Sequence, residues 1–433
     1  MASPSSPIAA ISDNSATNSG LRVLILSQHF WPESFRINDV ARDLSEAGCE
    51  VSILTGQPNY PGGLIFEGYR SYATTVEHYQ DLRVFRVPLV PRGRGGALRL
   101  VSNYLSFIVS ASTIGVWRLR HQKFDAILVY GTSPILQAIA AVWLAKLKRC
   151  ALVTWIQDLW PQSLEATGYV KSPRALAAVA KVVSWIYARC DLLLVQSKAF
   201  EASVRQLSAE TPIRYHPNPG EAGNALNCVG DSPTPPALLL DGAFNLVFAG
   251  NLGTAQSLDS VLDAAEHLRD LPDIRVWLIG SGQRSKWLEE EVERRGLTNV
   301  RLPGRFESSQ MPAIFAQASA LLVSLVNDSA MNLTIPSKLQ SYLAAGRPIV
   351  AALNGEGARI VLEAGAGVSC AAGDGAALAV ALRELQARTQ AVRNAMGFAG
   401  RAYYQQHFAP QRLTQSLIAH LQLAIDARMA QLQ

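Results

Sequence analysis

One short segment of the C-terminal half has the composition of an anion-binding site. It reads Thr334-Ile335-Pro336-Ser337-Lys338. Proline suits the first position of a helix, where its missing N–H would have no partner in any case. The free N–H groups of the next turn, the Ser337 hydroxyl and the Lys338 ammonium would then point at an anion such as a diphosphate. The alternative interpretation is an ordinary helix start with a surface lysine.

Three glycine-rich turns precede this segment, and each follows an apolar run. They are Gly250-Asn251-Leu252-Gly253, Gly280-Ser281-Gly282 and Gly304-Arg305. Glycine lets the backbone approach a ligand closely, and the helix that follows presents free N–H groups. Glycine is also common in such turns for steric reasons alone. The apolar run before Gly250 is not followed by a G-x-G-x-x-G fingerprint, and the chain has no Walker A sequence. A dinucleotide site is therefore not indicated.

A carboxylate follows an apolar run in the first half of the chain. The run Val153–Pro161 reads VTWIQDLWP, which places Asp158 between Trp155 and Trp160. The carboxyl ends of parallel strands are where α/β folds bind ligands. Asp158 is therefore a candidate catalytic residue, and the tryptophans could stack on sugar rings. A structural aspartate in a turn and tryptophans that cap the core are the alternative.

The loop after the first predicted strand is dense in functional groups and would face the same edge. Its candidate acceptor-side residues are His29, Glu33, Arg36 and Asn38. Asn38 could also be no more than a helix cap. Other chemistries are not indicated, since the chain lacks H-E-x-x-H and G-x-S-x-G sequences and its five cysteines form no C-x-x-C pair. We therefore expect reduced thiols and no metal site.

The elements that must position these residues follow an alternating pattern of apolar strands and helices. Continuous Val/Ile/Leu runs separated by helices predict a parallel sheet that is buried on both faces. The predicted strands of the first half are 21–27, 50–55, 83–87, 126–130, 151–156 and 192–196. Those of the second half are 245–249, 275–279, 300–302, 321–325 and 348–352.

A stretch rich in Pro, Gly and Asn separates the two halves and predicts an interdomain linker. We expect two α/β domains with a ligand cleft between them. The predicted boundaries are a flexible tail at 1–20, an N-terminal domain at 21–218, the linker at 219–240, a C-terminal domain at 241–410 and a last helix at 411–433. That helix could lie on its own domain or cross back to the first.

Composition and charge narrow the function classes. The 433 residues are 49% hydrophobic and 17% charged, which excludes a disordered chain. The formal net charge of +5 is uneven, because residues 21–218 carry 22 Lys/Arg against 14 Asp/Glu and residues 219–433 carry 17 against 19. Eight Lys/Arg and no Asp/Glu lie between Arg83 and Lys123. This concentration predicts an anionic partner.

The segment Leu100–Trp117 is the most apolar part of the chain. Its length is at the lower limit for a transmembrane helix, but Asn103, Thr113 and four serines argue against a lipid-spanning role. With arginines on both flanks, the segment could rest on anionic lipid. The alternative is an ordinary domain helix with solvated basic ends. Residues 1–20 lack a basic region and an apolar core, so they do not predict a signal peptide.

Seven stretches in order resemble a known family. They are QHFWPESFRIND (28–39), LTGQPNYPGG (54–63), NYLSF (103–107), WIQDLWPQS (155–163), HPNP (216–219), FAGNLGTAQSL (248–258) and TIPSK-x-Q-x-YLAAGRPI (334–349). Together they resemble family 4 glycosyltransferases of the GT-B fold, which has two Rossmann-like parallel-sheet domains facing across a cleft. The resemblance is strongest to the bacterial O-antigen and capsule subgroup that includes N-acetyl-L-fucosamine transferases.

The resemblance implies a retaining transfer of a sugar from a nucleotide donor, with UDP as the expected carrier, no cofactor and no obligatory metal. It places the donor on the C-terminal domain and the acceptor on the N-terminal domain. Asp158 and Lys338 become the candidate catalytic residues. The implied donor-binding residues are Gly250, Asn251, Gly253, Gln256, Arg305, Ser337 and Ser341.

Two departures from the broad family concern charge. Many members carry two glutamates eight positions apart before the A-x-G-x-P stretch, where this chain has Leu333 and Ser341. Asn251 and Gln256 also replace the usual basic residues after G-x-L. Lys338, with Arg284 or Arg305, would have to supply the positive charge. The departures leave open a catalytically inactive nucleotide-binding accessory protein, and a UDP-sugar epimerase of the same fold is a further alternative.

The basic stretch and the resemblance together predict a lipid-linked acceptor, namely a glycan on polyprenyl diphosphate, for surface polysaccharide such as O-antigen, capsule or exopolysaccharide. The predicted location is cytoplasmic and peripheral on the inner membrane face of a bacterium, with the Arg83–Lys123 region on anionic lipid. Nucleic acid is not an expected partner, because no nucleic-acid-binding motif accompanies the charge.

Overall fold

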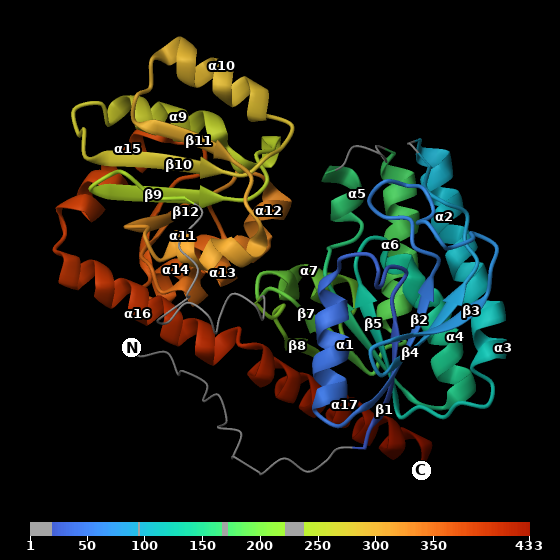
Figure 1. Ribbon diagram of the computed structural model, residues 1–433. Coiled ribbons are helices and arrows are strands. Elements are labelled where there is room, and N and C mark those ends of the chain that lie inside the picture. Colours follow the sequence, from blue (N-terminus) through green and yellow to red (C-terminus); the bar gives the residue numbers. More distant parts are fainter. Residues whose placement is uncertain (1–19, 94–95, 167–171, 221–237) are drawn as a thin grey trace.

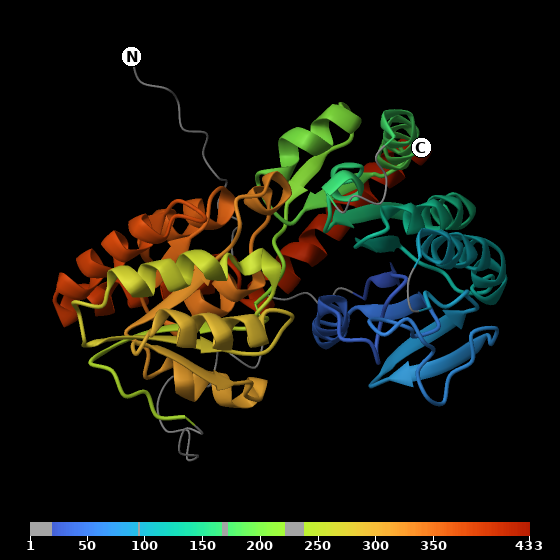
Figure 2. The ribbon, with the colours of Figure 1, turned by 90° about the horizontal axis from the view of Figure 1, so that it is seen from above.

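Two Rossmann-like lobes stand side by side in the computed structural model (Figure 1). The structure describes residues 20–93, 96–166, 172–220 and 238–433. Nearly all of the predicted tail at 1–20 and most of the predicted linker at 219–240 lie outside these residues. Each lobe is a sheet with helices on both faces, as the view from above shows (Figure 2).

The N-terminal lobe has an eight-stranded sheet in the order β3-β4-β2-β1-β5-β6-β7-β8. Its strands are β1 (Arg22–Leu26), β2 (Glu50–Gly56), β3 (Thr75–Tyr79), β4 (Leu82–Val87), β5 (Ala126–Gly131), β6 (Ala151–Ile156), β7 (Leu192–Val195) and β8 (Ile213–Tyr215). Strands β5 and β6 are buried along their whole length, as their apolar runs predict. The sheet is parallel except for β3, which pairs antiparallel with β4.

Helices cover both faces of this sheet, and each face has its own hydrophobic core. The helical elements are α1 (Arg36–Glu46), α2 (Ala97–Ser110), the π-helical turn η1 (Ala111–Gly115), α3 (Val116–Arg118), the 3-10 turn η2 (Ile135–Gln137), α4 (Ala138–Lys148), α5 (Gln162–Ala166), α6 (Pro173–Tyr187) and α7 (Phe200–Leu207). Helix α1 buries Ile37, Val40 and Leu44 on the face opposite α2 and α4.

The C-terminal lobe has a six-stranded, fully parallel sheet in the order β11-β10-β9-β12-β13-β14. Its strands are β9 (Phe244–Ala249), β10 (Ile274–Ile279), β11 (Val300–Gly304), β12 (Ala320–Ser324), β13 (Ile349–Ala352) and β14 (Gly367–Cys370). Its helical elements are η3 (Thr254–Gln256), α9 (Leu258–His267), α10 (Ser285–Arg295), η4 (Ser308–Gln310), α11 (Met311–Phe315), α12 (Ser329–Leu333), α13 (Ser337–Ala345), α14 (Glu356–Glu363), α15 (Gly375–Ala387) and α16 (Gln390–His407).

The last helix, α17 (Pro410–Leu432), leaves the C-terminal lobe and crosses to the other one (Figure 1). Leu417, Leu421 and Ala424 are buried in the N-terminal core beside α1, β5 and β6. The helix therefore joins the two lobes along the lower side of the view in Figure 1.

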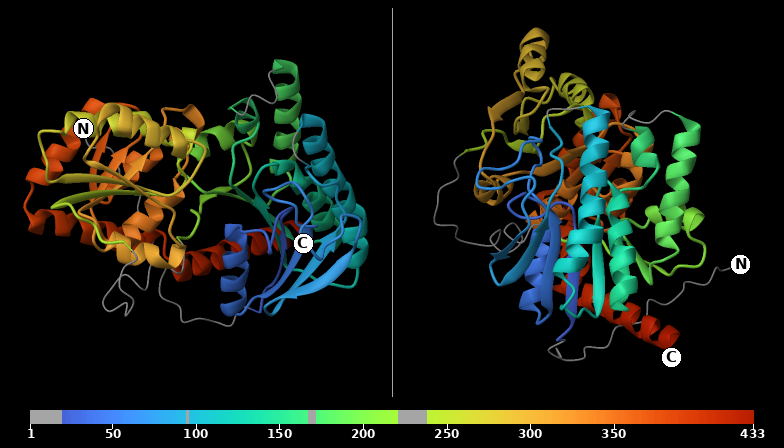
Figure 3. Two further views of the ribbon diagram at one scale, coloured as in Figure 1. Left: turned by 45° about the horizontal axis from the view of Figure 1, so that its top comes forward. Right: turned by 90° about the vertical axis from the view of Figure 1, so that its right-hand side faces the viewer.

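One helical stretch of the described residues, Leu98–Arg118, is long and apolar enough to cross a membrane by length and composition alone. It runs along the outer side of the N-terminal lobe, next to α4 (Figure 3). Asn103 on this stretch is fully buried, accepts from the Gln28 amide and donates to the Val90 carbonyl. These bonds fix one face of the helix to the protein, while its opposite face is exposed.

Candidate active site

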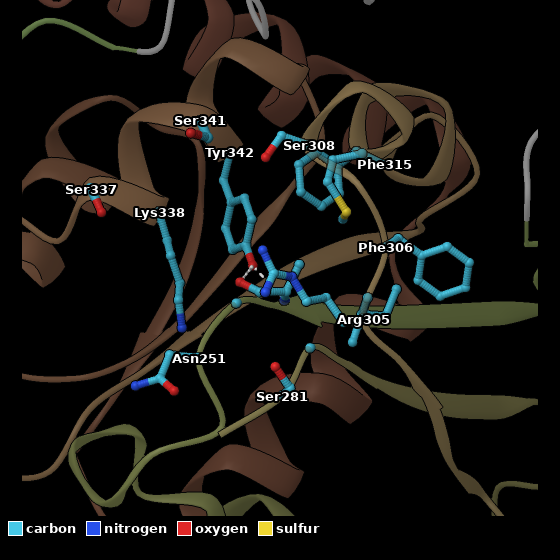
Figure 4. Close-up of a pocket in the computed structure, with 15 residues that line it drawn as sticks. Asn251, Ser281, Arg305, Phe306, Ser308, Phe315, Ser337, Lys338, Ser341 and Tyr342 are labelled. Carbon is cyan, nitrogen blue, oxygen red and sulfur yellow. Dashed lines mark hydrogen bonds between the residues drawn. The ribbon is translucent and has the colours of Figure 1, made fainter. Parts of the chain in front are cut away.

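A cavity of about 470 Å³ lies at the carboxyl ends of strands β9, β10 and β11 of the C-terminal sheet. The turns after β9, β10 and β11 form one wall, and helix α13 forms the other (Figure 4). Six predicted donor-side residues line it: Gly250, Asn251, Arg305, Ser337, Lys338 and Ser341. The predicted Gly280-Ser281-Gly282 turn also lines it through Gly280 and Ser281, whereas the sequence did not point to Phe306, Ser308, Met311, Phe315 and Tyr342.

Lys338 supplies a positive charge to this cavity without a carboxylate partner among the described residues. Its Nζ donates to Gln256 Oε1 at 2.6 Å and lies 3.7 Å from the centroid of the Phe248 ring. Burial lowers the pKa of Lys338 to about 7. A buried ammonium with only a neutral acceptor and an aromatic ring is poised for an anionic ligand.

The start of α13 adds hydrogen-bond donors beside this ammonium. The helix begins at Ser337, with Pro336 in the N-cap position and no side chain that caps its first turn. Pro336 thus stands one position earlier than the sequence predicts, because its ψ of 131° is extended rather than helical. The uncapped N–H groups and the positive end of the helix dipole favour an anion in the cavity.

Two glycines let the turns after β9 and β10 touch. Gly250 has a φ of +139° and Gly280 a φ of +144°, and a Cβ added at Gly280 would overlap the Gly250 carbonyl. A Cβ at Gly250 would lie 2.6 Å from Lys338 Cε, so this glycine also gives the lysine its room. Tyr342 fixes the same strand end, because its hydroxyl accepts from the Ala249 N–H at 2.8 Å.

Two predicted donor residues stand behind the lining. Gln256 contacts the cavity only through its hydrogen bond to Lys338. Gly253 lies against the Asn251 amide, where an added Cβ would be 2.8 Å from Nδ2. Both residues therefore support groups that line the cavity.

The second positive group of the cavity is Arg305, which follows β11 and points toward the Tyr342 hydroxyl (Figure 4). It has no ion pair with any described residue. Arg284, the other sequence candidate, lies elsewhere, because its guanidinium pairs with Asp259 and stacks on the Trp287 ring at 3.5 Å. Arg305 and Lys338 are thus the cations that remain for a ligand.

A second cavity of about 490 Å³ lies between the lobes. Residues from both lobes line it: Ser34, Phe35, Arg36, Asn38, Asp39, Tyr79 and Asn218 from the N-terminal lobe, and Ile335, Ser337 and Gln340 from the C-terminal lobe. Ser337 lines both cavities, so the two spaces meet at the start of α13. The Gln340 amide donates to the Asn218 carbonyl at 2.7 Å and joins the lobes there.

The predicted acceptor-side residues divide into two groups. Arg36 and Asn38 line the second cavity, whereas His29 and Glu33 are each 2% exposed and line neither one. Glu33 Oε1 accepts from the backbone N–H groups of Asn59 and Tyr60 at 2.7 Å, and His29 Nδ1 lies 3.0 Å from Oε2. The pair therefore holds the loops together beneath the surface.

Asp158 lies after β6 but lines neither cavity. Its Oδ2 accepts from both the N–H and the hydroxyl of Ser133 at 2.9 Å. Trp155 is fully buried and Trp160 is 4% exposed, so both pack in the core and neither ring is free to stack on a sugar. Of the two interpretations of these tryptophans, the structure supports the core.

Leu333, which stands where the family resemblance implies the first glutamate, packs in an apolar environment. Leu333 ends α12, which contacts α5 across the cleft, and its side chain packs against the N-terminal core. Ser341, at the position of the second glutamate, lines the first cavity. In the part of the chain that the structure describes, no group of three or more His, Cys, Asp or Glu could hold a metal ion.

Comparisons with known proteins agree with this geometry. Residues 243–388 match the family described as Glycosyl transferases group 1, and residues 34–219 match the Glycosyl transferase 4-like domain. WcaI of Escherichia coli K12, whose name assigns it to colanic acid biosynthesis as a glycosyl transferase, is 25% identical over 338 residues, which cover 75% of this chain and 82% of WcaI.

Solved structures show the same fold at low sequence identity. Sucrose-phosphate synthase of Thermosynechococcus elongatus superimposes with a TM-score of 0.70 at 16% identity and covers 94% of this chain and 100% of its own. HepE of Anabaena, solved in complex with UDP, gives a TM-score of 0.63 at 15% identity with 93% and 100% coverage. The two family matches follow one another along the chain and, with WcaI, support a glycosyltransferase, while the solved structures show that its fold is GT-B.

Proposed function

We propose that the protein is a retaining, metal-independent glycosyltransferase that moves an N-acetylated deoxy-hexosamine from a UDP-sugar to a lipid-linked glycan. The observation that carries this proposal is the meeting of the two cavities at Ser337. One cavity holds the cations Lys338 and Arg305, and the other is shared by both lobes. A donor diphosphate in the first cavity would place its sugar next to an acceptor in the second.

The donor cavity suits a nucleoside diphosphate. The Lys338 ammonium and the uncapped N–H groups of α13 would stabilise the negative charge that develops on the leaving diphosphate. Arg305 and Phe306 follow β11 at the far side of the cavity, where the base would lie. HepE, which shares the fold, was solved with UDP, and this supports UDP as the nucleotide.

The outer side of the N-terminal lobe suits an anionic membrane. Leu98, Val101, Leu105 and Val109 are three and four positions apart on α2 and are 81%, 49%, 54% and 60% exposed. Trp143 and Leu147 on the neighbouring α4 are also more than half exposed. The spacing puts the α2 side chains on one face of the helix.

Basic side chains stand next to this apolar face. Arg118 and Arg120 lie over the exposed Trp117 ring, with the Arg120 guanidinium carbon 4.2 Å from its centroid. An apolar face with arginines at its border fits the surface of anionic lipid. We therefore propose a peripheral location on the cytoplasmic face of a bacterial inner membrane, where a polyprenyl-diphosphate-linked acceptor would be met. The match to WcaI supports a place in surface polysaccharide synthesis, such as O-antigen, capsule or exopolysaccharide.

The experiment that tests the transferase activity measures UDP release. Purified protein is incubated with a panel of UDP-sugars, including N-acetylated deoxy-hexosamines, with and without a lipid extract that contains polyprenyl-diphosphate-linked glycans. We expect UDP release that depends on the extract, and a lipid product with one more sugar. Tight UDP binding without turnover would instead indicate an inactive nucleotide-binding accessory protein. That alternative is motivated by Leu333 and Ser341, which stand where the family resemblance implies two glutamates.

Membrane binding is tested separately with vesicles of phosphatidylglycerol and phosphatidylcholine. Replacing both Leu98 and Leu105 by serine removes exposed apolar surface, so co-sedimentation with the vesicles should fall at least several-fold. The matched control is Leu362→Ser, because Leu362 is 59% exposed on α14 of the other lobe. Equal binding of both variants would refute the proposed surface.

A further inference from the structure

The geometry points to a diphosphate-binding subsite of its own on the N-terminal lobe, formed by Arg92 and Arg99 between the interdomain cavity and the apolar face of α2. This inference rests on the proposed lipid-linked acceptor. The ligand that it assigns is the diphosphate of a polyprenyl diphosphate, with the polyprenyl chain against α2 and the attached sugar toward the interdomain cavity.

The Arg92 guanidinium lies against the rings of Tyr60 and Tyr104, which together form an aromatic shelf. Its carbon is 5.3 Å from the centroid of Tyr60 and 6.0 Å from that of Tyr104, and Nη2 donates to the Tyr104 hydroxyl at 3.4 Å. No carboxylate among the described residues pairs with Arg92 or with the exposed Arg99. Arginine held by rings and lacking an acid partner keeps its donors available for a phosphate.

The backbone around Arg92 is held in place by close loop contacts. The Gly93 N–H donates to the Gly63 carbonyl at 2.8 Å, and a Cβ at Gly63 would overlap Gly93. The Arg92 N–H donates to Asn59 Oδ1 at 3.3 Å. Arg99 lies directly over Gly93, where a Cβ would collide with its guanidinium. The two arginines therefore flank one glycine turn.

The carboxylate of Glu33, which bonds to the Tyr60 backbone, is already satisfied. Glu33 accepts from the Tyr60 N–H but is 2% exposed and bonded to His29 and Asn59 as well. Its carboxylate is thus beneath the Tyr60 backbone and does not compete for Arg92. The positive charge of Arg92 and Arg99 remains open to a ligand from outside.

The position of the shelf connects the two surfaces that a lipid-linked acceptor must touch. On one side, the Tyr60 ring packs on Phe35 at 5.1 Å, and Phe35 lines the interdomain cavity. On the other side, Tyr104 belongs to α2, whose exposed Val101 and Leu105 are its near neighbours in sequence. A diphosphate at Arg92 would therefore lie between a bound sugar and an apolar chain.

This distinguishes Arg92 from the other basic residues of the Arg83–Lys123 region. Arg86 is fully buried, pairs with Glu77 and donates to the Gly56 carbonyl, so it contributes nothing to an outward field. Arg118 and Arg120 lie at the other end of the apolar helix, on Trp117. Arg92 and Arg99 instead flank the Gly93 turn, next to the loop that holds Asn59 and Tyr60.

The test measures binding of farnesyl diphosphate by calorimetry to the full chain, with the donor cavity saturated by UDP. Loss of a charge-assisted hydrogen bond of about 1.5–3 kcal/mol corresponds to roughly 10- to 150-fold. We expect Arg92→Gln to weaken farnesyl diphosphate binding by at least tenfold, and Arg99→Gln, at an exposed position, by several-fold. Farnesol binding and the melting temperature should not change.

The matched control is Arg174→Gln, which removes an exposed arginine at the start of α6 and should leave binding unchanged. Farnesyl diphosphate binding that is equal in wild type, Arg92→Gln and Arg99→Gln overturns the inference. It is also overturned if these variants lose only phosphatidylglycerol vesicle binding, since the arginines would then serve the membrane surface. Transfer to a lipid-linked acceptor by variants with wild-type farnesyl diphosphate affinity would refute the subsite and leave the proposed function standing. Farnesyl diphosphate binding that depends on Arg92, without transfer to any lipid-linked acceptor, would support the subsite and refute the proposed function.

Discussion

The pH dependence of donor binding tests whether Lys338 carries the positive charge of the donor cavity. Burial lowers the pKa of Lys338 in the free protein to about 7, so about nine-tenths of the side chains are neutral at pH 8. A diphosphate beside Nζ favours the charged form and raises this pKa. Binding of a UDP-sugar at pH 8 should therefore take up about 0.9 proton, and the Kd should rise about 25-fold from pH 6.5 to pH 8.5.

Two substitutions separate charge from shape. Lys338→Arg keeps a cation that does not titrate in this range, so proton uptake should disappear and the Kd should become nearly independent of pH. Lys338→Gln removes the charge, and the Kd at pH 6.5 should rise about 10- to 150-fold, as expected for a charge-assisted hydrogen bond of about 1.5–3 kcal/mol. Calorimetry in buffers with different ionisation enthalpies measures the uptake directly.

Arg305→Gln is the control for this experiment, because it removes the other cation of the cavity and leaves Lys338 in place. It should weaken binding at every pH and preserve the proton uptake. Wild-type protein that binds the UDP-sugar at pH 8 without taking up a proton would refute the reasoning. So would proton uptake that persists in Lys338→Arg, since another group would then be its source.

Three further predictions concern the turns, the core and the N-terminal lobe. Gly280→Ala forces a Cβ into the Gly250 carbonyl at a φ of +144°, so urea unfolding should show a loss of about 1–3 kcal/mol together with weaker UDP binding, whereas Gly296→Ala, with a φ of +60° and open space, should cost less and leave UDP binding unchanged. Burial of His216, with His420 as a lesser cause, lowers its pKa to about 3, so the folded state binds fewer protons than the unfolded state below pH 6.5. Stability from this residue should fall by about 1.6 kcal/mol between pH 6.5 and pH 5, and a His216→Phe variant should show a smaller loss in urea titrations. Asp158→Asn keeps an oxygen that accepts from Ser133, so kcat should stay within about tenfold of wild type, and a loss beyond about a thousandfold would make Asp158 the base.

The central strands of both sheets could be predicted from sequence, but three of the four edge strands could not. Runs such as those of β5 and β6 are apolar throughout, because both faces of a central strand are buried. Strand β3 reads TVEHY, is largely exposed and pairs antiparallel at the edge, so it lacks that signal. Strands β8 and β14 were missed for a related reason, since they are short and mix polar with apolar residues.

The donor site was predictable where its chemistry is local in the chain. Ser337 and Lys338 stand together at a helix start, and Gly250 marks a turn, so their types and spacing indicated phosphate chemistry. Tyr342 was a missed signal of the same kind, four positions after Lys338 and hence on the same side of α13. Phe306 and Phe315 could not be assigned in this way, because the tertiary fold alone brings them to the cavity.

The number of basic residues in a stretch of sequence does not show how many of them can face a ligand. The eight basic residues from Arg83 to Lys123 enter the count equally, yet Arg86 is buried against Glu77 from the neighbouring strand. The hydrogen bonds from Arg86 to the Gly56 and Trp31 carbonyls hold the loops that follow β2 and β1. The sequence alone does not distinguish a buried, structural arginine such as Arg86 from an arginine that faces a ligand. The distinction requires the pairing of β3 with β4, which brings Glu77 to Arg86.

The distribution of carboxylates limits the chemistry that the proposed transfer can use. Among the described residues that line the two cavities, Asp39 is the single carboxylate, and it pairs with Arg36 at 3.6 Å and Arg42 at 3.3 Å. Leu333, at a position where the family resemblance leads us to expect glutamate, packs against the other lobe. A protein carboxylate is therefore a poor candidate to take the proton of the acceptor hydroxyl, and under the proposed function the oxygens of the departing diphosphate are the base within reach. That assignment in turn requires Lys338 to be charged during transfer, because a neutral lysine would leave the same oxygens without compensation.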